Sequence, residues 1–243
     1  MPLKNSIKTA LLGVGSVVSR NHKSKLLYYH DVFGETRYTD MGTPRELFKQ
    51  HLAVIENEGY KVVNRIENIE GEVALLFDDG FRGIYDIRQE FYNRGLCPTV
   101  FLAVSLIGQP GYLMKEDILE LQSHGFIFES HGWSHKDMTT FTGSALTHEL
   151  LDSRKWLSDF LGKEVRELCL PIGYFSDYVV TEAHKAGYNA IYSSIPGNYF
   201  EKVHGSLITR NLLQFATPKQ AKYILRGGHE LIRGRYEKMH FKV

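Results

Sequence analysis

The chain has 243 residues, of which 43% are hydrophobic and 23% charged, with a formal net charge of +1. This composition excludes a disordered chain and a membrane-spanning one, and the length suits a single α/β barrel domain. The small net charge gives no general attraction to nucleic acid, so we expect no nucleic-acid partner. The two cysteines, Cys97 and Cys169, are too few for a disulfide framework, and we expect two buried, reduced thiols.

The N-terminal segment carries a weak signal for export. Lys4 and Lys8 precede an apolar run over residues 10–18, and small residues up to Ser19 would suit a signal peptidase. Two glycines and a serine interrupt the run, which favours an amphipathic helix or a lead-in segment over cleavage of residues 1–19. A cytoplasmic location is therefore favoured, and export stays open. No stretch of the sequence reaches the roughly 20 apolar residues of a membrane-spanning helix.

Short apolar or β-branched runs alternate along the chain with segments of helical periodicity. The predicted strands are 26–30, 73–77, 99–104, 126–130, 167–170, 190–193 and 207–213. The predicted helices are 44–59, 84–95, 115–125, 147–161, 176–187 and 218–225. In the first helix we expect Thr43 as the N-cap, Pro44 at the first position and Gly59 just beyond the end.

This alternation implies parallel strands joined by helical crossovers, either in a closed barrel or in an open doubly wound sheet. Seven strands would close a barrel. We expect one domain over residues 1–243, with a lead-in segment 1–25, a barrel 26–213 and a C-terminal helical segment 214–243. In both architectures functional groups gather beyond the carboxyl ends of the strands, so polar residues that directly follow an apolar run carry the functional information.

Two adjacent carboxylates follow the second predicted strand. Asp78 and Asp79 come after the apolar run 74–77 and before Gly80, which permits a sharp turn. Neighbouring residues at a strand end point in different directions, so one carboxylate can bind a metal while the other faces a substrate. A turn followed by a helix N-cap is the structural alternative.

Two histidines follow the fourth predicted strand. His131 and His135 are spaced i, i+4, which puts both rings on one side of a tight loop and allows them to chelate one ion. Two nitrogens and one carboxylate oxygen form the ligand set of a catalytic zinc or similar ion with open positions. Because the chain contains 11 histidines, a chance pair is the alternative.

Both motifs resemble those of a known family. Phe77–Gly80 and Ser130–His135 look like the first two motifs of the polysaccharide deacetylases, the NodB-like carbohydrate esterases. The resemblance runs over about residues 26–213 and includes Tyr29-His30 and the strand that contains residues 98–102. It implies a distorted (β/α)7 barrel that removes acetyl groups from N-acetylated sugars.

The resemblance also implies roles for four residues of this chain. Asp78 would be the general base. Asp79, His131 and His135 would hold one divalent metal ion, zinc in the first place, with cobalt or nickel as alternatives. The same four residues emerge from the spacing of the two motifs alone.

The third family motif, Arg-x-Pro-Tyr-Gly, aligns with residues 169–173 but is altered. Cys169 stands at the arginine position and Ile172 at the tyrosine position. In the family the arginine orients the base, whereas the tyrosine position gives its backbone N–H to the developing oxyanion. Only the second role survives a change of side chain, so we expect Ile172 to donate. Loss of the arginine leaves the protonation state of Asp78 open, although some branches with a Pro-x-Gly motif look similar.

Three further residues are candidates for substrate binding because of their places in the sequence. Arg210 precedes the end of the last predicted strand and can position a carboxylate or a sugar hydroxyl, with a structural ion pair as the alternative. Trp133 and Tyr174 are candidate sugar platforms, or packing residues. The family's Leu-x-His general acid has no recognisable counterpart, since His229 and His240 lie in unlike surroundings and are expected to be exposed.

Basic residues also gather near the C-terminus of the sequence. They are Arg226, Arg233, Arg235 and Lys238. We interpret them as a solvated helix face, and a phosphate- or membrane-binding patch is the alternative.

The predicted function is hydrolysis of N-acetyl groups on a sugar or polysaccharide, with an N-acetylated glycan as the partner. One alternative is a non-catalytic glycan-binding barrel, suggested by the altered third motif and the missing general acid. The intact Asp78 argues against it. The other alternative is a metal hydrolase of a different non-peptide amide. The sequence leaves the glycan and the oligomeric state open.

Overall fold

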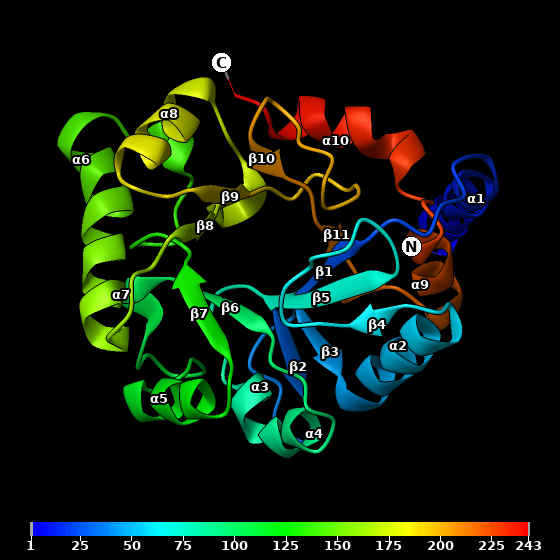
Figure 1. Ribbon diagram of the computed structural model, residues 1–243, viewed down its shortest axis with the longest axis horizontal. Coiled ribbons are helices and arrows are strands. Elements are labelled where there is room, and N and C mark those ends of the chain that lie inside the picture. The colour runs from blue at the N-terminus through cyan, green and yellow to red at the C-terminus, as the bar shows by residue number, and fades with distance from the viewer. Residues whose placement is uncertain (1, 243) are drawn as a thin grey trace.

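The computed structural model describes residues 2–242, with side chains from residue 6 onward. Parallel strands form the centre of the molecule and helices surround them (Figure 1). The strands are β1 (Lys25–Tyr29), β2 (Asp31–Phe33), β3 (Gly42–Pro44), β4 (Lys61–Val62), β5 (Glu72–Phe77), β6 (Thr99–Leu102), β7 (Ile127–Ser130), β8 (Glu167–Cys169), β9 (Ala190–Tyr192), β10 (Leu207–Ile208) and β11 (Asn211–Leu212). The α-helices are α1 (Pro2–Val18), α2 (Arg45–Asn57), α3 (Gly83–Asp86), α4 (Arg88–Tyr92), α5 (Lys115–Ser123), α6 (Gly143–Thr147), α7 (Ser153–Leu161), α8 (Asp177–Lys185), α9 (Pro218–Leu225) and α10 (Arg233–His240).

The main sheet closes on itself. Its order is β10-β9-β8-β7-β6-β5-β1-β11, with every neighbouring pair parallel and β4 paired to β5 outside this path. β10 and β11 are two halves of one stretch, 207–212, whose first half pairs with β9 and whose second half pairs with β1. Counting this stretch once gives seven strand positions around a ring. The predicted distorted (β/α)7 barrel is therefore confirmed.

Side chains alternate between the inside of the barrel and the layer beneath the helices, as the two-residue period of a strand requires. On β5, Ala74 and Leu76 belong to the inner cluster, whereas Val73, Leu75 and Phe77 join the larger core under the helices. Asp78 lies two residues beyond Leu76, just after β5, so its side chain also faces the inside of the barrel.

The first predicted helix begins later than expected. Thr43 does not cap it, because Thr43 lies in β3 and its hydroxyl donates to the Gln214 backbone oxygen. Pro44, extended at φ −58° and ψ 138°, precedes α2 without a side-chain cap. Thr43 thus belongs to the pairing of β2 with β3, although the local sequence favours it as a helix cap.

Two other predicted helices differ in detail. The helix expected over 84–95 is broken at Ile87 into α3 and α4. The helix expected from residue 147 begins already at Gly143 and passes through a π-helical turn, η3 (His148–Asp152), before α7. Such π turns are frequent at functional sites, and this one contributes a buried carboxylate to the candidate site.

Segments at both ends of the described chain pack on the outside of the barrel. α1 lies against α9, and the short helix η5 (Glu230–Ile232) leads into α10. Within residues 2–242 we find no helix with the length and apolar character needed to cross a membrane. Both cysteines are free, and Cys169 is buried as expected, but Cys97 is partly exposed.

Candidate active site

Three predicted ligands converge at the carboxyl ends of β5 and β7. Asp79 Oδ1 lies 3.2 Å from His131 Nε2 and 2.8 Å from His135 Nε2. One ligand atom from each residue falls within 4.8 Å of the other two. Asp79 and His131 are buried and His135 is half-buried, so this cluster opens toward solvent on the His135 side.

The backbone around this cluster is strained. Four non-glycine residues among those described have positive φ, and three of them are predicted site residues: Asp79 (71°), His135 (57°) and Ile172 (61°). Such conformations cost about 1–3 kcal/mol each and persist only where the surroundings enforce them. The strain is thus concentrated where the sequence motifs predict chemistry.

The donor atoms fit a divalent cation. Asp79 Oδ1 is buried and makes no well-formed hydrogen bond, although both imidazole Nε2 atoms are close to it. His131 Nδ1 lies 2.7 Å from the Cys169 backbone oxygen, which can only accept, so in the neutral ring the proton is on Nδ1 and Nε2 presents a lone pair. The lone pairs of Asp79 Oδ1 and His131 Nε2 converge in a way that suits a positive charge between them, and an Asp/His/His set is typical of catalytic metal sites.

The electrostatics of the cluster favour the ionised carboxylate. Burial acts to raise the pKa of Asp79, but the close imidazoles of His131 and His135 outweigh it and hold that pKa well below its usual value. A second group of possible ligands, Asp78, His131 and Cys169, overlaps the first. It suits a metal less well, because burial raises the pKa of the Cys169 thiol well above its usual value and keeps it protonated.

Asp78 is held by a buried arginine from the other side of the barrel. Arg210 lies between β10 and β11 and donates from its two terminal nitrogens to Asp78 Oδ1 (2.7 Å) and Oδ2 (3.0 Å). Its Nε donates to the Ser193 backbone oxygen at 2.9 Å, and its guanidinium lies 4.2 Å from the centre of the Tyr28 ring. Burial acts to raise the pKa of Asp78, but the Arg210 charge brings it below its usual value. Asp78 is therefore ionised at neutral pH.

Of the two partners expected for Arg210, a carboxylate and a sugar hydroxyl, the structure provides the carboxylate. Arg210 is 1% exposed, so its guanidinium has no surface for a sugar. Asp78 is thus paired with an arginine from the last strand, although the third motif of this chain has none. Cys169 stands beside this pair, with its sulfur 3.7 Å from Asp78 Oδ1.

The loop that carries the two histidines is held by Glu149, which the sequence analysis missed. Glu149 is 3% exposed and comes from the π-helical turn η3. Its Oε2 accepts from the backbone N–H groups of Trp133 and Ser134, both at 3.0 Å. The only sequence signal for it is a charged residue on an otherwise buried helix face.

Ile172 presents a backbone N–H at the edge of the site. It sits in the short helix η4 (Pro171–Gly173), directly after the strand whose Cys169 oxygen binds His131. Within the described chain its N–H donates to no other residue, and its side chain is 54% exposed. The N–H is thus available to a ligand, as the oxyanion role expects.

His30 directly follows β1 and continues the row of Leu26 and Tyr28, which belong to the inner cluster. Its charge contributes, after burial and nearer partners, to lowering the pKa of both Asp78 and Asp79. Gln214 Oε1 accepts from the His30 backbone N–H (3.1 Å) and lies 2.7 Å from His30 Nδ1. The proton of the neutral ring is therefore on Nδ1 and Nε2 is left open. In the sequence, only the family resemblance marks His30.

Comparison with known proteins agrees with this geometry. A family model described as polysaccharide deacetylase matches residues 65–191, just over half of the chain. The chain belongs to the polysaccharide deacetylase family. Family membership supports a hydrolase that deacetylates sugars.

Two curated relatives are similar over part of their length. The chain is 24% identical over 186 residues to the putative polysaccharide deacetylase YxkH of Bacillus subtilis (strain 168), covering 72% of this chain and 66% of that protein. It is 26% identical over 129 residues to the peptidoglycan-N-acetylmuramic acid deacetylase PdaA of the same organism, covering 52% and 48%. The chain thus spans less than two thirds of the length of either relative.

Solved structures share the fold. The Streptococcus pyogenes deacetylase PplD superposes with a TM-score of 0.71 at 18% identity, over 84% of this chain and 98% of that chain. IcaB from Ammonifex degensii gives the same TM-score and identity, over 86% and 98%. At these identities the likeness concerns the barrel.

The remaining predicted residues of this family member have other partners. Trp133 is partly exposed, and its ring packs 4.4 Å from that of His148. One face of Tyr174 is covered by the Lys242 ammonium, 3.9 Å from the ring centre, so only the other face could meet a sugar. The expectation that His229 and His240 are exposed is wrong, because His229 is 4% exposed beside Asn211 and His240 is half-buried.

Proposed function

We propose that this protein is a metal-dependent deacetylase of an N-acetylated sugar or polysaccharide. The observation that carries the proposal is the pairing of two adjacent aspartates with different partners. Asp78 is ionised against Arg210, and Asp79 points into the His131 and His135 cluster. A base and a ligand set side by side are what hydrolysis of an amide needs.

Each residue of the site has its own role in the proposed reaction. A divalent cation held by Asp79, His131 and His135, zinc with cobalt or nickel as alternatives, would supply Lewis-acid polarisation and bring the pKa of water toward about 7. Asp78 takes the proton from the attacking water, and Arg210 fixes the direction of its carboxylate. The Ile172 N–H donates to the oxygen that becomes negative when the acetyl carbonyl is attacked.

We propose His30 as the proton donor to the departing nitrogen. Gln214 holds Nδ1 of its ring, which leaves Nε2 without a hydrogen-bond partner in the described chain. When protonated there, His30 can give this proton to the amine as the carbon–nitrogen bond breaks, leaving acetate and a free amino sugar. This role replaces the general acid that the sequence lacks in its family position.

The non-catalytic alternative loses its main motivation. It rested on the missing arginine of the third motif and on the missing acid. Arg210 and His30 supply candidates for both tasks from other strands. A binding protein has no use for a buried carboxylate kept ionised next to a ligand set.

The test is acetate release by the metal-loaded protein from a panel of N-acetylated glycans. We would include chitin-like oligomers, poly-N-acetylglucosamine and peptidoglycan fragments, the last because PdaA is named for acting on N-acetylmuramic acid. We expect release from at least one of them and about one metal ion per chain by elemental analysis. Metal-loaded protein that releases acetate from none of these, and from no wider set of amides, would contradict the proposal.

A further inference from the structure

The first helix, α1, buries small side chains and exposes large apolar ones, which is the reverse of the usual arrangement in a globular protein. The side of α1 that faces the barrel carries mostly small residues: Leu12, Gly15 and Ser16 are buried there. Gly15 lies so close to the Gly228 backbone that an added Cβ would fall 2.5 Å from its oxygen. This close approach fixes which side of α1 faces inward.

The large apolar side chains of α1 point outward instead. Those exposed by about half or more are Ile7 (54%), Leu11 (47%), Val14 (57%), Val17 (77%) and Val18 (70%). A helix on a globular protein normally buries its large apolar stripe and exposes polar residues. An uncovered stripe of this length marks an interaction surface.

The C-terminal segment extends this surface. Ile7, Leu11 and Met239 line one shallow groove between α1 and α10. Together with Leu231 of η5, α1 and α10 supply seven of the fourteen large apolar side chains that are exposed on the described chain. Figure 1 shows the two helices on the same side of the barrel. We call this surface the α1–α10 face: Ile7, Leu11, Val14, Val17, Val18, Leu231 and Met239.

Basic residues border the α1–α10 face. Lys8 and Arg235 line the groove itself, Lys219 lies beside Val14, and Lys238 is exposed one turn from Arg235. Residues 2–20 contain no Asp or Glu. The surroundings of the apolar stripe are therefore positive.

The two glutamates of the C-terminal segment are turned toward the protein. Glu230 accepts from Asn21 and Asn198, and Glu237 lies 3.3 Å from His204. Neither carboxylate offsets the positive border of the α1–α10 face by pairing with Arg235 or Lys238.

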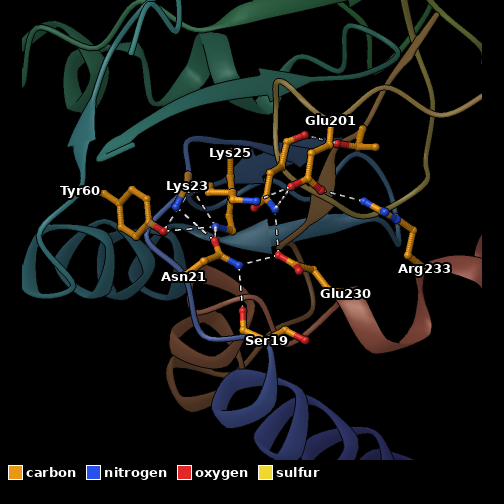
Figure 2. Close-up of polar contacts among 10 residues, drawn as sticks. Ser19, Asn21, Lys23, Lys25, Tyr60, Glu201, Glu230 and Arg233 are labelled. Atoms are coloured by element: carbon orange, nitrogen blue, oxygen red, sulfur yellow. Dashed lines mark hydrogen bonds and ion pairs between the residues drawn. The ribbon is translucent and has the colours of Figure 1, made fainter. Parts of the chain in front are cut away.

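A polar network keeps the helices in place. Figure 2 shows Asn21, just after α1, donating from one side-chain nitrogen to the Ser19 oxygen (2.8 Å) and to Glu230 Oε1 (2.6 Å). Arg233, at the start of α10, donates to Glu201 Oε2 at 2.9 Å, and Glu201 also binds Lys23. The end of α1 and the start of α10 are thus joined to the barrel as one unit, so their apolar side chains form a fixed surface.

We propose that the α1–α10 face docks this protein onto an anionic lipid membrane. Interfacial helices lay an apolar side into the boundary between headgroups and acyl chains and place Lys and Arg at the level of the phosphates. The stripe on α1 and its basic border have this arrangement. A second copy of the chain fits less well, because a two-fold contact would bring the same basic border against itself. Docking is independent of the proposed hydrolysis, since no catalytic candidate lies on this face.

The experiment is co-sedimentation of the full chain with vesicles. One set is made of equimolar phosphatidylcholine and phosphatidylglycerol, and the other of phosphatidylcholine alone. We expect binding to the first set, weakened by high salt, and little binding to the second. Leu11→Asp should lower the affinity by about tenfold or more, because it replaces a side chain that would be buried in the membrane. Lys238→Glu should lower it as well.

Matched variants on other helices serve as controls. Leu119 on α5 is 46% exposed, almost as much as Leu11, so Leu119→Asp should bind vesicles like the wild type. Lys155 on α7 is exposed like Lys238, so Lys155→Glu should also bind vesicles like the wild type. Circular dichroism and acetate release in solution report whether each variant is folded.

Three results would overturn the proposal. They are equal binding to neutral and anionic vesicles, wild-type binding by a folded Leu11→Asp variant, and no binding by the wild type. A dimer in solution that Leu11→Asp converts to a monomer, without vesicle binding, would assign the face to a second copy instead.

Discussion

Asp78 and Asp79 are neighbours in the sequence, yet their side chains meet different partners. Asp78 follows the inward row of β5 and reaches Arg210, whereas Asp79, at φ 71°, turns toward the two histidines. The positive φ separates the two carboxylates. Consecutive residues can therefore take the two different roles of the proposed function, base and metal ligand.

This difference predicts opposite effects of two similar substitutions. Asp78→Asn should keep the metal and lose about 10²–10⁴-fold in kcat, because it removes the base. Asp79→Asn should lose metal first. Acetate release and metal content measured in parallel distinguish them, with the His131→Ala, His135→Ala double variant as the metal-free reference. An Asp78→Asn protein that loses its metal while Asp79→Asn keeps it would reverse the two roles.

Removal of Arg210 should change both the pH profile and the stability. In the wild type the folded pKa of Asp78 is lowered, so the stability it contributes is present at neutral pH and is lost as pH falls through that folded pKa. In Arg210→Met the buried carboxylate has no partner and its pKa rises. We expect the acidic limb of kcat to move to higher pH, and the free energy of unfolding at neutral pH to fall by about 3–5 kcal/mol.

Urea unfolding and a pH–rate profile check this prediction. Arg37→Met is the control, because Arg37 pairs with an exposed aspartate at the surface and should change neither quantity measurably. An unchanged acidic limb in a folded Arg210→Met protein would mean that Asp78 is not the titrating base.

At the scale of elements, the histidine loop depends on a helix that contributes no ligand. The π turn η3 brings Glu149 under the loop between His131 and His135, where it accepts two backbone N–H groups. Ser130 holds the same loop from the other side by accepting from the Gly132 N–H, and the Tyr188 hydroxyl donates to Ser130. The positions of the two proposed histidine ligands are thus set by residues outside the motif.

Glu149→Ala should therefore weaken metal binding without removing a ligand. Loss of such outer partners typically costs about 10–100-fold in metal affinity. The variant also leaves two partly buried N–H groups without their acceptor, so we expect a loss of stability of about 1–3 kcal/mol. Competition with a zinc chelator measures the affinity. Glu182→Ala, at a surface ion pair on α8, should bind zinc like the wild type.

At the scale of the whole molecule, the end of the barrel opposite the candidate site contains a buried lysine. Lys25 opens β1 and is 1% exposed, and its ammonium donates to Asn21 Oδ1, the Lys23 oxygen and the Tyr60 hydroxyl. Burial lowers the pKa of Lys25 to about 7, although Glu230 and Glu201 act to raise it. The unfolded chain thus holds this proton more tightly than the folded one.

This lysine should make stability rise with pH. Between about pH 7 and pH 10 the unfolded state binds one more proton, so Lys25 adds roughly 1.4 kcal/mol of stability per pH unit. In Lys25→Met this slope should be absent. Urea unfolding over this pH range measures the difference, and Lys185→Met, an exposed lysine on α8, should keep the wild-type slope. Parallel slopes in all three proteins would show that Lys25 is not neutralised in the folded state.

The sequence by itself determined the alternation of strands and helices, because hydrophobic period and capping residues act over a few neighbours. It also singled out Asp78, Asp79, His131 and His135, since the residues of each pair lie close together along the chain. Their convergence at one end of the barrel followed from the rule that strand ends meet there.

Only the tertiary structure decided which arginine pairs with Asp78. Arg210 is separated from Asp78 by 132 residues, and it arrives there because the stretch 207–212 pairs with β9 on one side and β1 on the other. Thr43 likewise lies in a strand and not at a helix cap, because its partners are distant in the sequence. Glu149, His30 and the outward stripe of α1 likewise depend on contacts between distant segments, which local periodicity does not encode.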